Sequence, residues 1–169
     1  MRILGIDPGL AIVGWGVIDY QNTRFRTVAY GSIQTPAHTR TEERLHLIFS
    51  GMQQLIETYH PDAIAVEELF FNTNITTGIR VAEARGIILL SAEMAKIPIY
   101  EYTPLQVKQA VVGYGRAEKR QVISMVTHLL ALPKPPKPDD TADALAIAIC
   151  HAHTGGSRLR DYYNKGSKF

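Results

Sequence analysis

The chain has 169 residues, which is enough for one ordinary domain with its own hydrophobic core. Hydrophobic residues make up 46% and charged residues 20%, a composition typical of soluble globular proteins. A net charge of +2 indicates no particular partner, and the single cysteine, Cys150, excludes an internal disulfide. No apolar run has the length of a transmembrane helix, so we expect a cytoplasmic protein.

The first third of the chain predicts a β-meander and then an amphipathic helix. Residues 2–7, 13–20 and 25–35 have strand patterns with short connections, which favours antiparallel pairing. Thr39 followed by Glu42 predicts a capping box at the start of the helix. The apolar positions at helical spacing are Leu45, Ile48, Phe49, Met52, Leu55, Ile56 and Tyr59.

The rest of the chain alternates strands and helices. Strands are predicted at 63–69 and 97–102, and helices at 78–95, from Pro104, at 117–131 and at about 140–151. The last helix is apolar all round after its first turn, which indicates burial. At its end, His151 and His153 are expected to be surface residues or partners of the helix dipole. This order predicts an α/β fold with a mixed five-stranded sheet and helices on both faces.

We expect one domain over residues 1–155 and a basic, flexible C-terminal tail over residues 156–169. Positive charge also gathers between residues 106 and 125, where four cations face one acid. These cations are Lys108, Arg116, Lys119 and Arg120. A solvated surface explains such a cluster as well as a nucleic-acid interface does, so charge alone does not decide between them.

Acidic residues stand at the ends of apolar elements. Asp7 ends the first strand, Glu67 and Glu68 end the central one, and Asp140 and Asp143 share one face of the last helix. Each has a simpler explanation, because an aspartate before Pro-Gly suits a turn and acids suit the first turn of a helix. Together they predict a shared site, because strand ends and a helix start meet at one edge of an α/β sheet.

Clustered carboxylates bind hard divalent cations, Mg²⁺ above all. Two such ions about 3.5–4 Å apart stabilise both the attacking and the leaving oxygen of a phosphoryl displacement. A bare acidic pocket repels a phosphate backbone, so the site suits DNA only with metal present. The sequence has no Cys–His set, Ser–His–Asp set or Walker-type loop that competes with the acids.

An ordered series of motifs resembles the bacterial RuvC resolvases over about residues 1–153. A single fragment such as Gly-Ile-Asp-Pro-Gly is weak, but the order and spacing of the whole series are highly specific. The series consists of Ile3-Leu4-Gly5-Ile6-Asp7-Pro8-Gly9, Gly14-Trp15-Gly16, Val66-Glu67-Glu68-Leu69-Phe70, Ala84-Arg85-Gly86, Tyr102-Thr103-Pro104 with Val107-Lys108, Gly113-Tyr114-Gly115-Arg116-Ala117-Glu118-Lys119, and Asp140-Thr141-Ala142-Asp143-Ala144-Leu145-Ala146.

The resemblance implies a ribonuclease H-like fold and an endonuclease that resolves four-way (Holliday) DNA junctions by symmetric paired nicks during recombination and repair. It implies hydrolysis with two Mg²⁺ ions per site, Mn²⁺ as a substitute, and 5′-phosphate and 3′-hydroxyl products. By position in the motifs, the metal ligands and catalytic acids are Asp7, Glu67, Asp140 and Asp143. Glu68 and Asp139 remain open as supporting residues.

Position in the motifs also assigns the DNA contacts. Lys108 and Lys119 match lysines that approach the scissile backbone. Phe70 matches an aromatic residue that stacks on bases near the branch point, with Phe71 as its alternate. Arg116 and Arg120 are then expected to contact phosphates.

The predicted helix at 78–95 indicates a homodimer. Its apolar residues cover most of its circumference, whereas a helix on the outside of one sheet needs a single apolar face. Either a second subunit or the 117–131 helix covers the surplus. A two-fold dimer matches the symmetry of a junction. The resemblance adds a branch-migration helicase complex of the RuvA–RuvB type as a partner.

Two other functions fit part of the sequence. A sugar-kinase or actin-like ATPase shares the architecture and uses an Asp-x-Gly turn, as Asp7-Pro8-Gly9 could, but it needs two such domains. A catalytically silent DNA-binding module has no need for the complete acid set.

Overall fold

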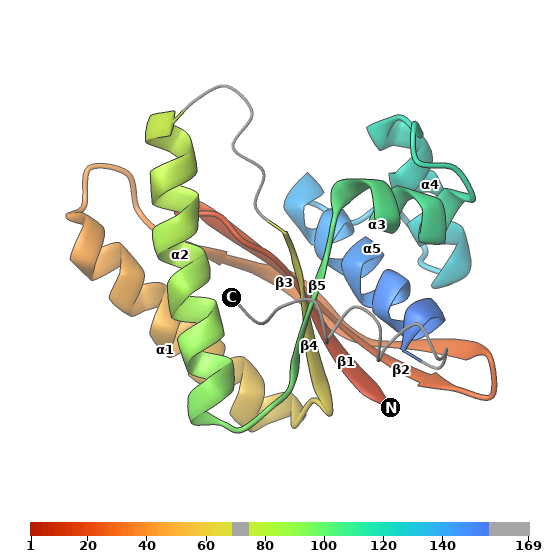
Figure 1. The fold of residues 1–169 in the computed structure, drawn as a ribbon, viewed down its shortest axis with the longest axis horizontal. Helices are drawn as coiled ribbons and strands as arrows, with labels where there is room; N and C mark the ends of the chain where they lie inside the picture. The colour runs from red at the N-terminus through yellow and green to blue at the C-terminus, as the bar shows by residue number, and fades with distance from the viewer. Residues whose placement is uncertain (69–74, 156–169) are drawn as a thin grey trace, which may run out of the picture.

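The computed structural model describes residues 1–68 and 75–155 (Figure 1). The predictions for Phe70, Phe71 and the tail at 156–169 lie outside the described residues. No helix of the described part is long and apolar enough to cross a membrane.

The sheet has five strands in the order β3-β2-β1-β4-β5. Three of them, β1 (Arg2–Asp7), β2 (Ile12–Gln21) and β3 (Arg24–Gln34), form the predicted antiparallel meander. The other two, β4 (Ala63–Glu67) and β5 (Ile99–Tyr102), continue the sheet beyond β1 in parallel. The mixed five-stranded sheet is therefore confirmed, and β1 lies at its centre with β4 beside it.

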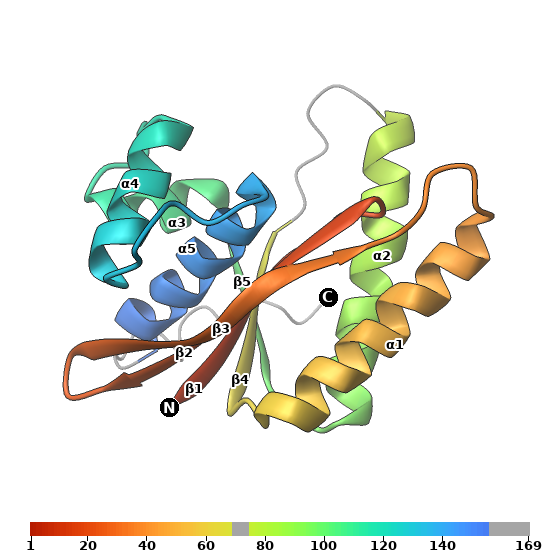
Figure 2. The same ribbon diagram turned by 180° about the vertical axis from the view of Figure 1, so that it is seen from behind.

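Helices cover both faces of the sheet (Figures 1 and 2). On one face lie α1 (Thr41–Tyr59) and α2 (Ile75–Met94), and on the other lie α3 (Pro104–Val112), α4 (Lys119–Leu129) and α5 (Asp139–Thr154). Each face has its own core. The first core contains Leu4, Ile6, Val17, Ile48, Met52, Ile64 and Ile88, and the second contains Ile3, Ile18, Val107, Val126, Leu145 and Ile149.

Glycines let α5 lie directly on the sheet. A Cβ atom on Gly5 would come 2.1 Å from the carbonyl oxygen of Ala144, and one on Gly14 would come 2.0 Å from that of Asp140. Only glycine permits such contact between backbones. As predicted, α5 is buried all round, because residues 141–152 are all buried except Asp143. The start of α5 is thus fixed beside the end of β1.

The caps of α3 and α4 hold the loop between them. Thr103 and Gln106 form a capping box at the start of α3, and Gly113 ends that helix with a φ of 93°. Glu118 and Gln121 form a second capping box at the start of α4. The predicted capping box of α1 is wrong, because that helix begins at Thr41 and its N-cap has no side-chain hydrogen bond.

The expectation for His151 is also wrong. Its side chain is buried, and its Nδ1 lies 2.7 Å from the hydroxyl of Tyr102. Thr154 donates a hydrogen bond to the same hydroxyl. The polar end of α5 therefore turns inward to β5, whereas His153 stays exposed with a hydrogen bond to the carbonyl oxygen of Ala110.

Candidate active site

A pocket of about 270 Å³ opens where β1 and β4 end beside α5. These two strands are parallel neighbours, so their last residues, Asp7 and Glu67, reach the same edge of the sheet. Asp143 joins them from the first turns of α5. The pocket lining consists of Asp7, Glu67, Pro104, Val107, Lys108, Lys119, Val122, Asp143, Ala146 and Ile147. Five of the six residues predicted to be catalytic thus line one pocket.

The apolar lining was not predicted from the sequence. Val107 and Val122 come from α3 and α4, and Ala146 and Ile147 lie one turn after Asp143 on α5. The available signal was helical spacing, since residues three and four positions beyond an acid share its face. These side chains exclude water from the acids, which raises the free energy of their ionised forms.

The choice between Glu67 and Glu68 follows from the end of β4. Glu67 pairs in register with Tyr102 of β5, is half-buried and lines the pocket. Glu68 is exposed, and its backbone N–H donates to the carbonyl oxygen of Tyr102. Its side chain is absent from the pocket lining.

Burial and neighbouring carboxylates raise the pKa of Asp7 to about 8. Burial has the largest effect, followed by the charges of Asp143, Glu67 and Asp140, and Lys119 only partly opposes them. The pKa of Glu67 is raised by the same two causes, burial and the charge of Asp143. The site therefore holds more negative charge than its own cations neutralise.

Two lysines line the pocket together with the acids. The Nζ of Lys119 donates a hydrogen bond of 2.9 Å to Asp143, and this bond is the main reason that the pKa of Lys119 is raised. Lys108 lines the same pocket and lowers the pKa of Glu67 by its charge. Both predicted lysines are thus part of the acidic site.

Asp140 lies one turn before Asp143 and outside the pocket lining. Its backbone packs on Gly14, which pairs with Asp7 across β1 and β2, and its charge still raises the pKa of Asp7. Asp139 is instead paired with Lys137 at 2.7 Å. Within residues 1–68 and 75–155, no three acidic, histidine or cysteine side chains are gathered closely enough to hold a metal ion as they stand.

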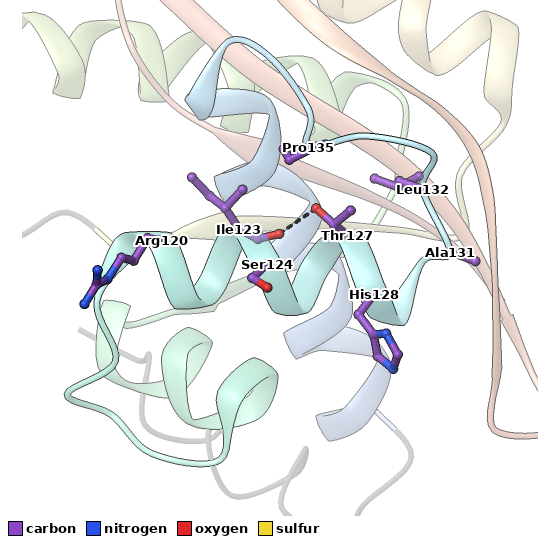
Figure 3. Close-up of a pocket in the computed structure, with 8 residues that line it drawn as sticks. All are labelled: Arg120, Ile123, Ser124, Thr127, His128, Ala131, Leu132 and Pro135. Carbon is purple, nitrogen blue, oxygen red and sulfur yellow. Dashed lines mark hydrogen bonds between the residues drawn. The ribbon is translucent and has the colours of Figure 1, made fainter.

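The two predicted phosphate contacts differ. Arg116 is exposed and forms no salt bridge with another described residue, whereas Arg120 is paired with Glu118 at 2.7 Å. Arg120 borders a second, larger pocket of about 640 Å³ along α4 and the chain after it (Figure 3). No carboxylate lines that pocket, so it lacks the chemistry of the acidic site despite its size.

Comparisons with known proteins agree with this geometry. Residues 3–151 match the family model "Crossover junction endodeoxyribonuclease RuvC". The RuvC of Clostridioides difficile is 56% identical over 91% of each chain, and that of Brevibacillus brevis is 60% identical over 90% of this chain and 92% of its own.

A solved structure of Thermus thermophilus RuvC is 35% identical with a TM-score of 0.84 and covers 99% of this chain and 98% of its own. A second one, in complex with a Holliday junction substrate, is 34% identical with a TM-score of 0.84 over 92% of this chain and 95% of its own. The fold, the acidic pocket and these similarities together show that this chain belongs to the RuvC family of crossover junction endodeoxyribonucleases.

Proposed function

We propose that this chain binds four-way DNA junctions and resolves them by paired, metal-dependent nicks during recombination and repair. The observation that carries the proposal is the half-buried Asp7, which shares one pocket with Glu67, Asp143 and two lysines. A junction-bound relative with 34% identity supports the choice of substrate. The reaction is hydrolysis of a phosphodiester to a 5′-phosphate and a 3′-hydroxyl end.

The donor set fits Mg²⁺. All the charged donors are carboxylate oxygens, and burial together with the charges of neighbouring carboxylates raises the pKa of Asp7 and Glu67. We propose that Asp7, Glu67, Asp140 and Asp143 hold two Mg²⁺ ions, with Mn²⁺ as a substitute. When bound, the ions supply Lewis-acid activation of water and neutralise charge on the transferring phosphate.

The remaining residues hold and orient the DNA strand. Lys119 has Asp143 as its partner, and if that carboxylate were to hold a metal ion, the ammonium group would be available to contact the phosphate. Lys108 lines the pocket, interacts with Glu67 by its charge and has no salt bridge within the described residues. The apolar wall of Val107 and Val122 keeps bulk water from the acids. Arg116, Arg120, Phe70 and Phe71 complete the proposed DNA contacts.

We further propose that α2 forms the interface of a two-fold homodimer. Its exposed side carries Ile79 (52% exposed), Leu90 (51%) and Met94 (59%), which are spaced along one face. The expectation that α4 covers this surplus is wrong, because α4 lies across the sheet from α2 (Figures 1 and 2). Ile88 lies on the other side of α2, where its side chain is fully buried in the core.

A branch-migration helicase complex of the RuvA–RuvB type remains our proposal for a further partner, and the cytoplasm for the location. Both proposals follow from family membership.

A nicking assay on a synthetic four-way junction tests the proposed activity. The wild-type chain with Mg²⁺ should cut two strands of like polarity symmetrically. Asp7→Asn should reduce cutting by at least about a thousandfold, yet keep or improve junction binding, because it removes a negative charge that faces phosphate. Glu68→Gln is the matched control, since Glu68 lies outside the pocket lining. Equal losses in both variants, or loss of binding in folded Asp7→Asn, would contradict the assignment.

A further inference from the structure

Few large apolar side chains are exposed in the described part of the chain. They are Met1, Leu47, Ile79, Leu90, Met94, Leu105 and Tyr114. The three on α2 belong to the proposed dimer interface, Met1 is the N-terminal residue and Leu47 lies on α1. The remaining two, Leu105 (59% exposed) and Tyr114 (47%), have no role in the fold or in the chemistry derived so far.

These two residues belong to segments that adjoin the acidic pocket, since α3 and α4 both contribute to its lining. Leu105 follows Pro104, which lines the pocket at the start of α3. The loop after α3 folds back onto it, because a Cβ on Gly115 would come 2.2 Å from the Cδ1 of Leu105. Tyr114 precedes that glycine. The α3–α4 loop therefore packs on the leucine at the start of α3 and carries an exposed aromatic residue.

The loop that carries Tyr114 is anchored at both ends. Before it, the N–H of Gly113 donates to the carbonyl oxygen of Gln109 at 2.9 Å. After it, Glu118 and Gln121 form their capping box. The backbone that carries the Tyr114 ring is thus fixed before any ligand binds. Binding therefore orders only one side chain, at a small entropic cost.

The charges around the ring identify the partner. Lys108 lies one turn after Leu105 on α3, Arg116 lies two residues after Tyr114, and Lys119 begins α4. Lys108 and Arg116 form no salt bridge with any other residue of the described chain. An exposed aromatic ring among unpaired cations is the pattern of a surface that stacks nucleic-acid bases and contacts their phosphates. A protein partner would be expected to meet a wider apolar patch with fewer cations.

We infer that Tyr114, supported by Leu105, stacks on a base that is unpaired or unstacked near the scissile phosphate of the junction. This inference rests on the proposed function and adds a stacking residue on the α3–α4 side of the pocket. Because every base has an aromatic face, stacking would act on branched DNA generally, and it would be weaker on intact duplex, where the bases are already stacked.

The test measures binding and base environment together. A four-way junction carries 2-aminopurine next to the cleavage site, and Ca²⁺ replaces Mg²⁺ so that the DNA stays intact. Wild-type protein should change the 2-aminopurine fluorescence on binding, as stacking of the probe requires. Tyr114→Ala should abolish that change and weaken junction binding roughly 5- to 150-fold, with a much smaller effect on linear duplex.

Two control variants separate stacking from a general effect on structure. Tyr114→Phe keeps the ring and should restore most of the affinity and the fluorescence change. Leu47→Ala removes a similarly exposed side chain on the other face of the sheet and should match wild type. Equal behaviour of the Ala and Phe variants, equal losses on junction and duplex, or an unchanged fluorescence signal in Tyr114→Ala would overturn the inference. If wild type itself fails to prefer the junction, the proposed function fails instead.

Discussion

The helices α2 and α5 are both apolar around most of their circumference, yet the structure treats them differently. α5 lies between the sheet and the pair α3 and α4, so almost all of it is buried (Figure 1). α2 buries Ala84, Ile88 and Ala92 on one side and exposes Leu90 and Met94 on the other. Within residues 1–68 and 75–155, other elements of the chain cover α5 on nearly every side, whereas one side of α2 stays exposed.

The difference in burial between α5 and α2 suits two different roles. α5 must hold Asp140 and Asp143 near Asp7, and a helix packed on glycine backbones has little freedom to move. The open face of α2 is free to meet another molecule, and its apolar surface stabilises such a contact without further residues. We therefore propose that the rigid helix α5 serves the chemistry and that the exposed face of α2 serves dimer assembly.

The largest effects are expected from aspartates placed on the two sides of α2. Ile88→Asp puts a charge in a fully buried position and should abolish folding, with a cost above about 4 kcal/mol. Leu90→Asp should leave the monomer folded and prevent dimerisation. Circular dichroism and analytical ultracentrifugation at micromolar concentration measure both outcomes. A dimeric Leu90→Asp variant would remove α2 as the interface.

A smaller but still severe effect is expected on the α5 side. Gly5→Ala places a Cβ 2.1 Å from the Ala144 carbonyl oxygen and 2.9 Å from the Ala148 Cβ, and backbone cannot yield as a flexible side chain does. The free energy of unfolding should fall by about 3 kcal/mol or more, measured by urea denaturation. A loss below about 1 kcal/mol would mean that α5 shifts easily, which contradicts its rigidity.

Much of this organisation followed from the sequence, and the failures have physical causes. The element order predicted the mixed sheet, and the all-round apolar pattern of 144–149 predicted a buried α5. Periodicity could not distinguish Glu67 from Glu68, because β4 is covered on both faces and lacks alternation. The sequence predicts a surface residue or a helix-dipole partner at His151, because its actual partner, Tyr102, lies 49 residues earlier in the chain and no local pattern reveals such a contact. Which side of α2 is exposed likewise could not be predicted from the sequence and is seen only in the packed structure.

An intermediate effect concerns pH and metal at Asp7. Its pKa of about 8 in the folded chain exceeds the ordinary value of 3.8, so the folded state holds a proton that the unfolded state has lost. Metal-free wild type should therefore lose stability as pH rises from about 4 to about 8. Asp7→Asn removes this ionisation and should be more stable than wild type at pH 8, on the order of 3 kcal/mol, but not at pH 4.

Thermal unfolding across this pH range, with and without Mg²⁺, provides the measurement. Mg²⁺ should stabilise wild type at pH 8 and affect Asp7→Asn much less, because the ion relieves the repulsion that the mutation also removes. Asp62→Asn is a control at an exposed acid of the opposite end of the sheet. A pH-independent difference between wild type and Asp7→Asn would contradict the raised pKa.

The smallest change in stability is expected where glycine is replaced by alanine at a position with no near neighbour. A Cβ on Gly86 of α2 meets nothing within 4 Å, whereas one on Gly51 of α1 meets the Cδ1 of Ile33 at 2.7 Å. In a monomeric Leu90→Asp background, Gly86→Ala should raise the free energy of unfolding by about 0.5–1 kcal/mol, the gain in helix propensity. Gly51→Ala should gain less stability, because Ile33 must move.

In the otherwise native chain, the dimer dissociation constant of Gly86→Ala reports how closely the two α2 helices of the proposed dimer approach each other. A weaker dimer places Gly86 at the contact, and an unchanged dimer with a more stable monomer places the contact nearer Leu90 and Met94.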